Sequence, residues 1–229
     1  MSGRIALLSL PFASSRRPSL QLGPTAGLAR SAGWLADPLH VNQDFAQLLG
    51  RDRYEALCEH RGTLLSEWLF AGEAFGSDAD DVDLSLAGCE FGATTAALGM
   101  AADEARAWLR RVRTVLAPAF LDAVVASVDW RAYDVVAFTS TFQQNVASIA
   151  LARRVKERHP GLTTLFGGAN FDGEMGLEFL RSVPWIDYAA VGEADRSFPA
   201  LLRALAADEA PDIPGIARRG PGGQVVFVR

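Results

Sequence analysis

Asp134-Val-Val-Ala-Phe-Thr-Ser140 is a short apolar run that ends in hydroxyl-bearing residues. Two further short apolar runs likewise lead into small residues: Leu162-Thr-Thr-Leu-Phe-Gly-Gly-Ala169 and Ile186-Asp-Tyr-Ala-Ala-Val-Gly-Glu193. Helix-patterned segments separate the three runs, and apolar strands that alternate with helices indicate a parallel sheet covered on both faces. Ligands of such sheets bind at the carboxyl ends of the strands, where these small residues gather. The pattern predicts that a large, flat ligand is held against this edge of the sheet.

The first half of the chain supplies two more expected strands, Ile5–Leu10 and Leu35–Val41. Between them we expect a loop over residues 11–17 and a helix whose first turn is weakened by Gly23 and Pro24. Residues from about 42 to 133 have helical spacing, interrupted by an acidic loop over residues 77–83. This region is predicted to be a long helical insertion between strands two and three.

The second half adds three expected helices, Val146–His159, Gly176–Ser182 and Phe198–Ala207. Residues 215–228 contain two short apolar stretches around a glycine turn, which predicts a hairpin. We therefore expect one α/β domain over residues 1–212, followed by a hairpin or linker over residues 213–229.

Composition excludes several classes of function. The formal net charge of -5 argues against a nucleic-acid binder that works through positive charge. No apolar run reaches membrane-spanning length, and the N-terminal run is too short for a signal peptide before it meets Arg16-Arg17-Pro18. We expect a cytoplasmic protein with no nucleic-acid or membrane partner.

Neither a metal site nor a catalytic residue stands out. Cys58 and Cys89 match no metal-ligand spacing and are expected to be reduced, partly buried thiols. An iron–sulfur cluster usually needs three or four thiolates, so none is expected within this chain. No serine, histidine and acid set indicates nucleophilic catalysis, and Glu193 and Asp195 are expected to stabilise a loop.

The strand ends carry the residues that we expect to meet a ligand. Gly167-Gly168 either lets a ligand approach the backbone or forms a tight strand-to-helix turn. Ser140 and Thr141 offer hydroxyls to the same crevice, and Gly192-Glu193 ends the next strand. A flavin or nucleotide is a weaker alternative, because no glycine-rich dinucleotide fingerprint follows the first strand and no P-loop is present.

Together these motifs resemble a known family. The resemblance rests on a first strand that runs into a proline-containing loop, followed by Thr139-Ser140, Gly167-Gly168 and Val191-Gly-Glu-Ala-Asp195. In these features the chain resembles the cobalamin-binding domain that precedes the catalytic barrel of B12-dependent radical S-adenosylmethionine (SAM) enzymes. The subgroup that matures ribosomally synthesised peptides is similar in three further stretches: Leu8-Ser-Leu-Pro-Phe-Ala-Ser-Ser-Arg-Arg-Pro-Ser-Leu-Gln-Leu-Gly23, Ser66-Glu-Trp-Leu-Phe70 and Phe138-Thr-Ser-Thr-Phe-Gln-Gln-Asn145. The resemblance implies a flavodoxin-like, doubly wound parallel sheet, a Rossmann-like B12-binding fold.

The resemblance also implies how the cofactor is held. The wider fold places an axial histidine in the loop after the first strand, and residues 11–17 contain no histidine, so base-off cobalamin without a protein histidine ligand is expected. Arg17 either pairs with a phosphate or a corrin amide or is a solvated loop arginine. By position, three groups of residues would lie under the corrin, along the nucleotide tail and near the rim: Pro11, Phe12, Arg17 and Leu20; Ser140, Thr141, Gly167, Gly168 and Ala169; Gly192 and Glu193. Pro18 and Thr139 are also expected to bind the cofactor.

The implied function is a cobalamin-binding module of a radical SAM peptide-maturation enzyme, with methyl transfer to a ribosomal peptide. The cysteine motif for a 4Fe-4S cluster is absent, so S-adenosylmethionine and the cluster would belong to a barrel outside this chain, in cis or in trans. The alternative is a non-catalytic protein of the same fold, either a precursor-peptide binder or a degenerate B12 module. Fold alone does not decide between them.

Overall fold

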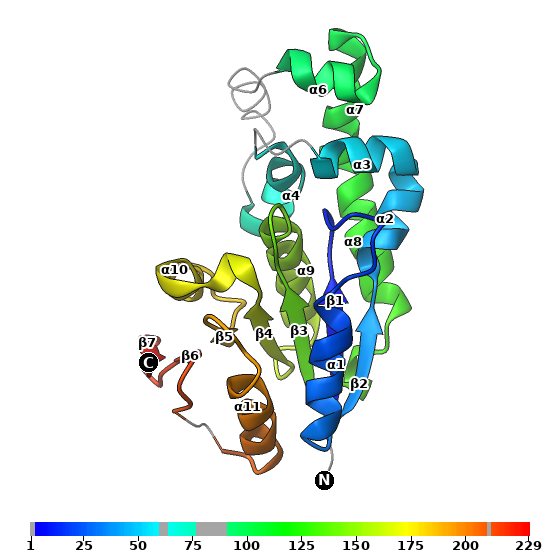
Figure 1. Ribbon diagram of the computed structural model, residues 1–229. Helices are drawn as coiled ribbons and strands as arrows, with labels where there is room; N and C mark the ends of the chain where they lie inside the picture. The colour runs from blue at the N-terminus through cyan, green and yellow to red at the C-terminus, as the bar shows by residue number, and fades with distance from the viewer. Residues whose placement is uncertain (1–2, 60–63, 77–90, 210–211) are drawn as a thin grey trace.

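The computed structural model describes residues 3–59, 64–76, 91–209 and 212–229. These residues form a sheet with the strand order β2-β1-β3-β4-β5-β6-β7 (Figure 1). The first five strands of this order are parallel, and β6 and β7 are antiparallel to their neighbours. The flavodoxin-like sheet expected from the sequence is thereby confirmed. The bounds of the strands are β1 Arg4–Ser9, β2 Leu35–Leu39, β3 Val135–Thr139, β4 Thr163–Gly167, β5 Tyr188–Ala190, β6 Ile216–Arg219 and β7 Val225–Phe227.

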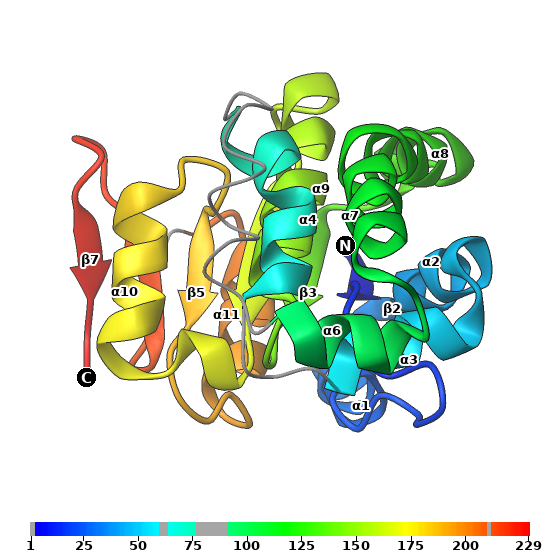
Figure 2. The ribbon, with the colours of Figure 1, turned by 90° about the horizontal axis from the view of Figure 1, so that it is seen from above.

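The central strands are apolar throughout because both of their faces are covered. Ile5 and Leu7 of β1 pack with α1 (Leu22–Ser31) and α11 (Ser197–Ala206) on one face of the sheet. Ala6 and Leu8 point to the other face, onto a larger core. That core includes α4 (Leu65–Phe75), α8 (Ala117–Ser127), α9 (Asn145–Arg158) and α10 (Gly173–Ser182), and Figure 2 shows the two layers from above.

The hairpin predicted at the C-terminal end is confirmed, and it extends the main sheet. β6 pairs with β5, with Ala217 opposite Ala189, and β7 pairs with β6. Ile216 and Ala217 are buried, so the hairpin contributes to the cores on both faces. The two strands of the hairpin, β6 and β7, therefore belong to the same sheet as β1 to β5.

The helical insertion between β2 and β3 is also confirmed. Its first helices cover the end of the sheet, and α6 and α7 stand beyond the carboxyl ends of the strands (Figure 1). The acidic loop predicted over residues 77–83 and the thiol of Cys89 lie outside the described residues. The remaining elements of the insertion are α2 Val41–Leu49, α3 Arg51–Glu59, α6 Phe91–Leu98, α7 Ala102–Arg111, the π-helical turn η2 Val112–Leu116 and the 3-10 turn η3 Trp130–Ala132.

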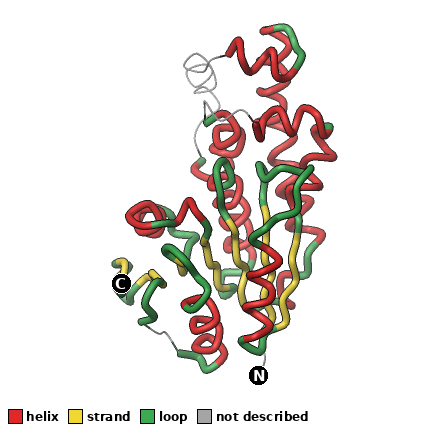
Figure 3. Tube along the Cα trace, viewed as in Figure 1, coloured by secondary structure: helices red, strands yellow, loops and turns green. Residues whose placement is uncertain are grey.

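Helix α1 accommodates the Gly23-Pro24 pair that the sequence suggested would weaken it. The helix begins at Leu22, so Pro24 falls in the first turn. Main-chain N–H groups of a first turn have no partner within the helix, and the missing N–H of proline therefore costs little there. Residues 10–21 form a long loop at the carboxyl ends of the strands, where Figure 3 shows several loops together.

Candidate functional site

Two pockets adjoin at the carboxyl edge of the sheet. The first, here called the loop pocket, lies between the β1–α1 loop, α3 and the β3–α9 loop and has a volume of about 400 Å³. The second, here called the glycine pocket, lies between α1, α11 and the ends of β3, β4 and β5 and has a volume of about 270 Å³. Gln21 lines both pockets. They flank β1 and β3, where connections leave the sheet in opposite directions and ligands of such folds bind.

The glycine pocket has apolar walls and a polar rim. Ala137, Leu165 and Ala190 line it from the strands, and Leu28 and Phe198 line it from the two helices. All five belong to the apolar core on this face or pack against it. The polar liners come from residues near the helix starts and the strand ends: Gln21, Thr25, Thr139 and Asp195. A flat apolar group with a polar attachment fits this arrangement.

Gly168 is required by the backbone as well as by the pocket. Its φ is +103°, and a Cβ at this position would overlap the carbonyl oxygen of Ser140. The Ser140 N–H in turn donates to the Gly167 carbonyl over 2.8 Å, so the ends of β3 and β4 meet here. The tight-turn reading of the glycine pair therefore holds for Gly168, while a Cβ on Gly167 would only touch Ala190 at 3.4 Å.

Ser140 is turned inward and lines neither pocket. It is fully buried, and its hydroxyl donates to Asn145 Oδ1 over 2.6 Å. Asn170 Nδ2 donates to the same hydroxyl over 3.1 Å and to the Phe142 carbonyl over 2.7 Å. Ser140 thus joins the ends of β3 and β4 and holds the turn in which Phe142 has a φ of +52°.

The structure sorts the thirteen residues expected to bind the cofactor. Phe12, Arg17, Pro18, Leu20 and Thr141 line the loop pocket. Thr139, Gly167, Gly168 and Gly192 line the glycine pocket. The others line neither: Pro11 and Ser140 are buried, and Ala169 and Glu193 are exposed beside the site. Gln21, Thr25, Asn42 and Glu55 line the pockets without having been expected, since no local motif marks them.

Phe12 contributes to the floor of the loop pocket from within a cluster of rings. It is 5% exposed. Its ring stacks on Tyr54 at 5.4 Å between centroids and meets Phe45 and Phe70 edge-on. The insertion helices α2, α3 and α4 supply these partners, so the insertion supports the floor of the pocket.

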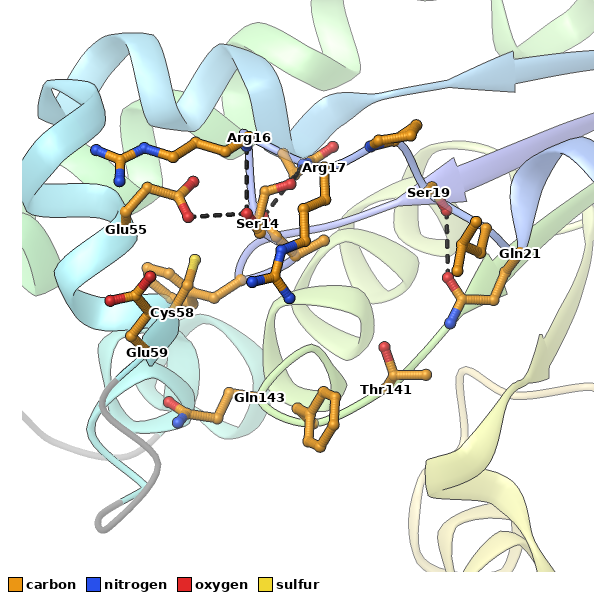
Figure 4. Close-up of a pocket in the computed structure, with 16 residues that line it drawn as sticks. Ser14, Arg16, Arg17, Ser19, Gln21, Glu55, Cys58, Glu59, Thr141 and Gln143 are labelled. Atoms are coloured by element: carbon orange, nitrogen blue, oxygen red, sulfur yellow. Dashed lines mark hydrogen bonds between the residues drawn. The ribbon is translucent and has the colours of Figure 1, made fainter.

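The two arginines of the β1–α1 loop differ in their surroundings. Arg16 also lines the loop pocket, but its guanidinium pairs with Asp52 at 2.8 Å. Arg17 points into the loop pocket (Figure 4) and makes no ion pair with any residue that the structure describes. The apolar side chains of Leu20 and Phe142 stand at the rim, 81% and 66% exposed. Among the described residues that line it, the loop pocket thus offers one arginine without an ion pair, together with the carboxylates of Glu55 and Glu59 and the apolar side chains at the rim.

The titratable groups around the site are held in defined states. Burial raises the pKa of the Cys58 thiol to about 12, so a thiol that lines the loop pocket stays protonated at neutral pH. Burial would also raise the pKa of Glu55, but hydrogen bonds from Ser15 and Ser14 outweigh it and lower that pKa. Glu55 is therefore ionised at neutral pH.

Within the described part of the chain, no histidine lines either pocket. The same residues contain no group of three or more histidine, cysteine, aspartate or glutamate side chains that could hold a metal ion. None of the helices that the structure describes is long and apolar enough to cross a membrane.

No family model matches the chain. A curated 2-(S-pantetheinyl)-carbapenam-3-carboxylate methyltransferase from Streptantibioticus cattleyicolor is 35% identical over 89 residues, which are 38% of this chain and 13% of that protein. The radical S-adenosylmethionine methyltransferase TsrM from Kitasatospora setae, solved with cobalamin and a 4Fe-4S cluster, matches 100% of this chain and 29% of its own with a TM-score of 0.50 and 11% identity. The chain thus spans less than a third of either protein, and the structural match shows a shared α/β fold.

Proposed function

We propose that this chain is the cobalamin-binding module of a B12-dependent radical SAM enzyme that matures a ribosomal peptide. The observation that carries the proposal is the pair of adjoining pockets at the carboxyl edge, one apolar and rich in glycine, the other open and free of histidine among the described residues. The fold shared with a cobalamin-bound methyltransferase and the local identity to a second methyltransferase support it.

The residues present fit this cofactor. The nucleotide tail of cobalamin ends in a flat apolar base, which suits the walls formed by Ala137, Leu165 and Phe198. Gly167 and Gly192 leave room beside the strand ends for the polar backbone of the tail. The corrin would rest over the loop pocket on the exposed side chains of Leu20 and Phe142, with its amides within reach of Arg17.

The chemistry would belong to the cofactor, because bound cobalamin supplies a cobalt centre that can carry a methyl group. The residues of this chain would bind, orient and shield it. The apolar floor at Phe12 would exclude water from the lower face, and no histidine lines the loop pocket among the residues that the structure describes. A base-off corrinoid without a protein histidine ligand is therefore proposed.

The partners of the module are part of the same proposal. A radical SAM barrel, in cis or in trans, would hold the 4Fe-4S cluster and S-adenosylmethionine and would close over the exposed upper face of the corrin. The precursor peptide would approach from the same side, where α6 and α7 stand beyond the sheet (Figure 1). Peptide binding without a corrinoid would instead favour the alternative, a non-catalytic module.

The direct test is reconstitution with hydroxocobalamin, followed by desalting and a visible spectrum. We expect a retained corrinoid with a base-off spectrum. Thr25→Trp, which fills the glycine pocket from α1, should abolish retention, whereas Ser31→Trp on the exposed end of the same helix should not. A colourless wild-type protein after desalting would contradict the proposal. Gly168→Trp is unsuitable as a blocking variant, since any Cβ there overlaps Ser140.

A further inference from the structure

Glu55 on α3 binds the β1–α1 loop through several hydrogen bonds at once. Its side chain accepts the Ser14 hydroxyl at 2.8 Å, the Ser15 main-chain N–H at 2.6 Å and the Ser15 hydroxyl at 2.7 Å. Glu55 is 3% exposed although it lies at the wall of the loop pocket (Figure 4). A buried carboxylate with this many donors is a strong, directional restraint on the loop.

Neighbouring polar side chains of the insertion hold the same short segment. The Tyr54 hydroxyl donates to the Ala13 carbonyl over 2.6 Å, and Asn42 Nδ2 donates to the same oxygen over 3.2 Å. Gln43 Nε2 donates to the Ser15 carbonyl over 3.2 Å. These bonds end at Ser15, and the next three residues, 16–18, are exposed. The restrained segment is therefore the base from which Arg17 projects.

Both oxygens of Glu55 are already used by the loop. Oε1 accepts from Ser15 and Oε2 accepts from Ser14, which leaves the carboxylate poorly placed to bind a ligand itself. We therefore expect Glu55 to act on a ligand indirectly, through the position of another residue of the loop. Arg17 lies two residues beyond Ser15 and points into the same pocket (Figure 4).

We infer that Glu55 is a positioning residue, which holds residues 13–15 so that the guanidinium of Arg17 is presented to the ligand of the loop pocket. The identity of that ligand rests on the proposed function, whereas the restraint on the loop does not. The helical insertion therefore has a role at the site itself, because α3 sets the direction of a binding residue that follows β1.

The restraint is tested without any ligand by limited trypsin digestion. Trypsin does not cleave before proline, so the Arg16–Arg17 bond reports on this loop while the Arg17–Pro18 bond stays intact. Glu55→Ala should be cleaved there about tenfold faster than wild type, as expected for loss of hydrogen bonds to a charged group. Glu55→Gln keeps one acceptor oxygen, so its rate of cleavage at this bond should lie between those of wild type and Glu55→Ala.

Asp187→Asn is the matched control. Asp187 is another carboxylate that accepts a main-chain N–H and a hydroxyl, both from Thr164, but it lies at the opposite end of the sheet. Asp187→Asn should be cleaved at Arg16–Arg17 at the wild-type rate, provided that the two proteins have the same thermal stability. If Glu55→Ala is cleaved no faster than wild type, the inference is wrong. Should Glu55→Ala fail to fold, the double variant Ser14→Ala/Ser15→Ala, which removes both hydroxyl donors to Glu55, tests the restraint from the loop side.

The positioning role is tested by cobalamin affinity in a double-mutant cycle. Glu55→Ala should weaken binding in the wild-type background and should add little in an Arg17→Ala background, because the two residues act as a unit. Additive losses, or unchanged affinity despite faster cleavage, would overturn the role. If wild-type protein binds no corrinoid, the proposed function fails, and the digestion still decides whether Glu55 holds the loop.

Discussion

Glu67 on α4 accepts the main-chain N–H of Val146 in the first turn of α9, with 2.8 Å between Oε2 and the nitrogen. Its other oxygen accepts the N–H of Asn145 over 3.1 Å. A carboxylate at a helix N-terminus satisfies donors that have no partner within the helix. The contact joins two of the motifs on which the family resemblance rests, residues 66–70 and 138–145, and it anchors the turn that carries Phe142.

Glu67 predicts a pH dependence of stability. Burial raises its pKa from 4.5 to about 7, although the two N–H donors oppose the shift. The folded state then binds a proton more tightly than the unfolded state, so the contribution of Glu67 is greatest below pH 4.5 and is lost as the pH rises through 7. The free energy of unfolding should fall between pH 5 and 8 by at most about 3 kcal/mol.

Urea unfolding at a series of pH values checks this prediction. Glu67→Gln removes the titrating group and leaves all others in place, so its unfolding free energy should have a flatter slope across the same range. Identical slopes for the two proteins would show that Glu67 does not titrate there.

Gly168→Ala should destabilise the fold strongly. A methyl group there overlaps the Ser140 carbonyl, and the φ of +103° is unfavourable for alanine. We expect a loss of about 3 kcal/mol in the free energy of unfolding. Gly27→Ala is the control, because Gly27 lies within α1 with open space around it and should gain about 0.5–1 kcal/mol. Equal effects of the two substitutions would contradict the geometry at Gly168.

Cobinamide, a corrinoid that lacks the nucleotide tail, separates the two pockets. If the glycine pocket holds the tail, cobinamide should bind wild-type protein at least about tenfold more weakly than cobalamin. Thr25→Trp should bind both corrinoids as weakly as the wild-type protein binds cobinamide, too weakly for retention on desalting, since Thr25 lines the pocket that the tail would occupy. Titrations followed by visible absorbance measure both affinities. A wild-type protein that does not distinguish the two compounds would place the tail elsewhere.

Arg17 and Arg16 should differ in their effect on corrinoid binding. Arg17→Ala removes the cation that points into the loop pocket and should weaken binding about tenfold. Arg16→Ala removes a solvent-exposed ion pair with Asp52 and should change binding by less than about twofold. Arg17→Lys should recover only part of the affinity, because an ammonium cannot make the paired hydrogen bonds of a guanidinium. Equal losses for both alanine variants would indicate a general charge effect.

Much of the architecture follows from local patterns in the chain. Strands β3, β4 and β5 are apolar runs between helical segments, and burial on both faces makes such runs recognisable. The small residues at their ends mark the edge where the pockets lie, as Gly167 and Gly192 at the glycine pocket illustrate. The hairpin near the C-terminus was predicted too, but its pairing with β5 was not. A sequence pattern indicates a strand without identifying the neighbouring strand with which it pairs.

The sequence by itself determined the parallel sheet, the place of the insertion and the edge of the sheet at which the two pockets lie, because alternation and glycine placement act over a few residues. Only the tertiary structure decided which side chains reach the pockets. Ser140 turns inward to Asn145, whereas Thr141 beside it lines the loop pocket. Glu55 meets Ser15 from 40 residues away. Side-chain direction past a strand end and contacts between distant helices depend on packing, which no local period encodes.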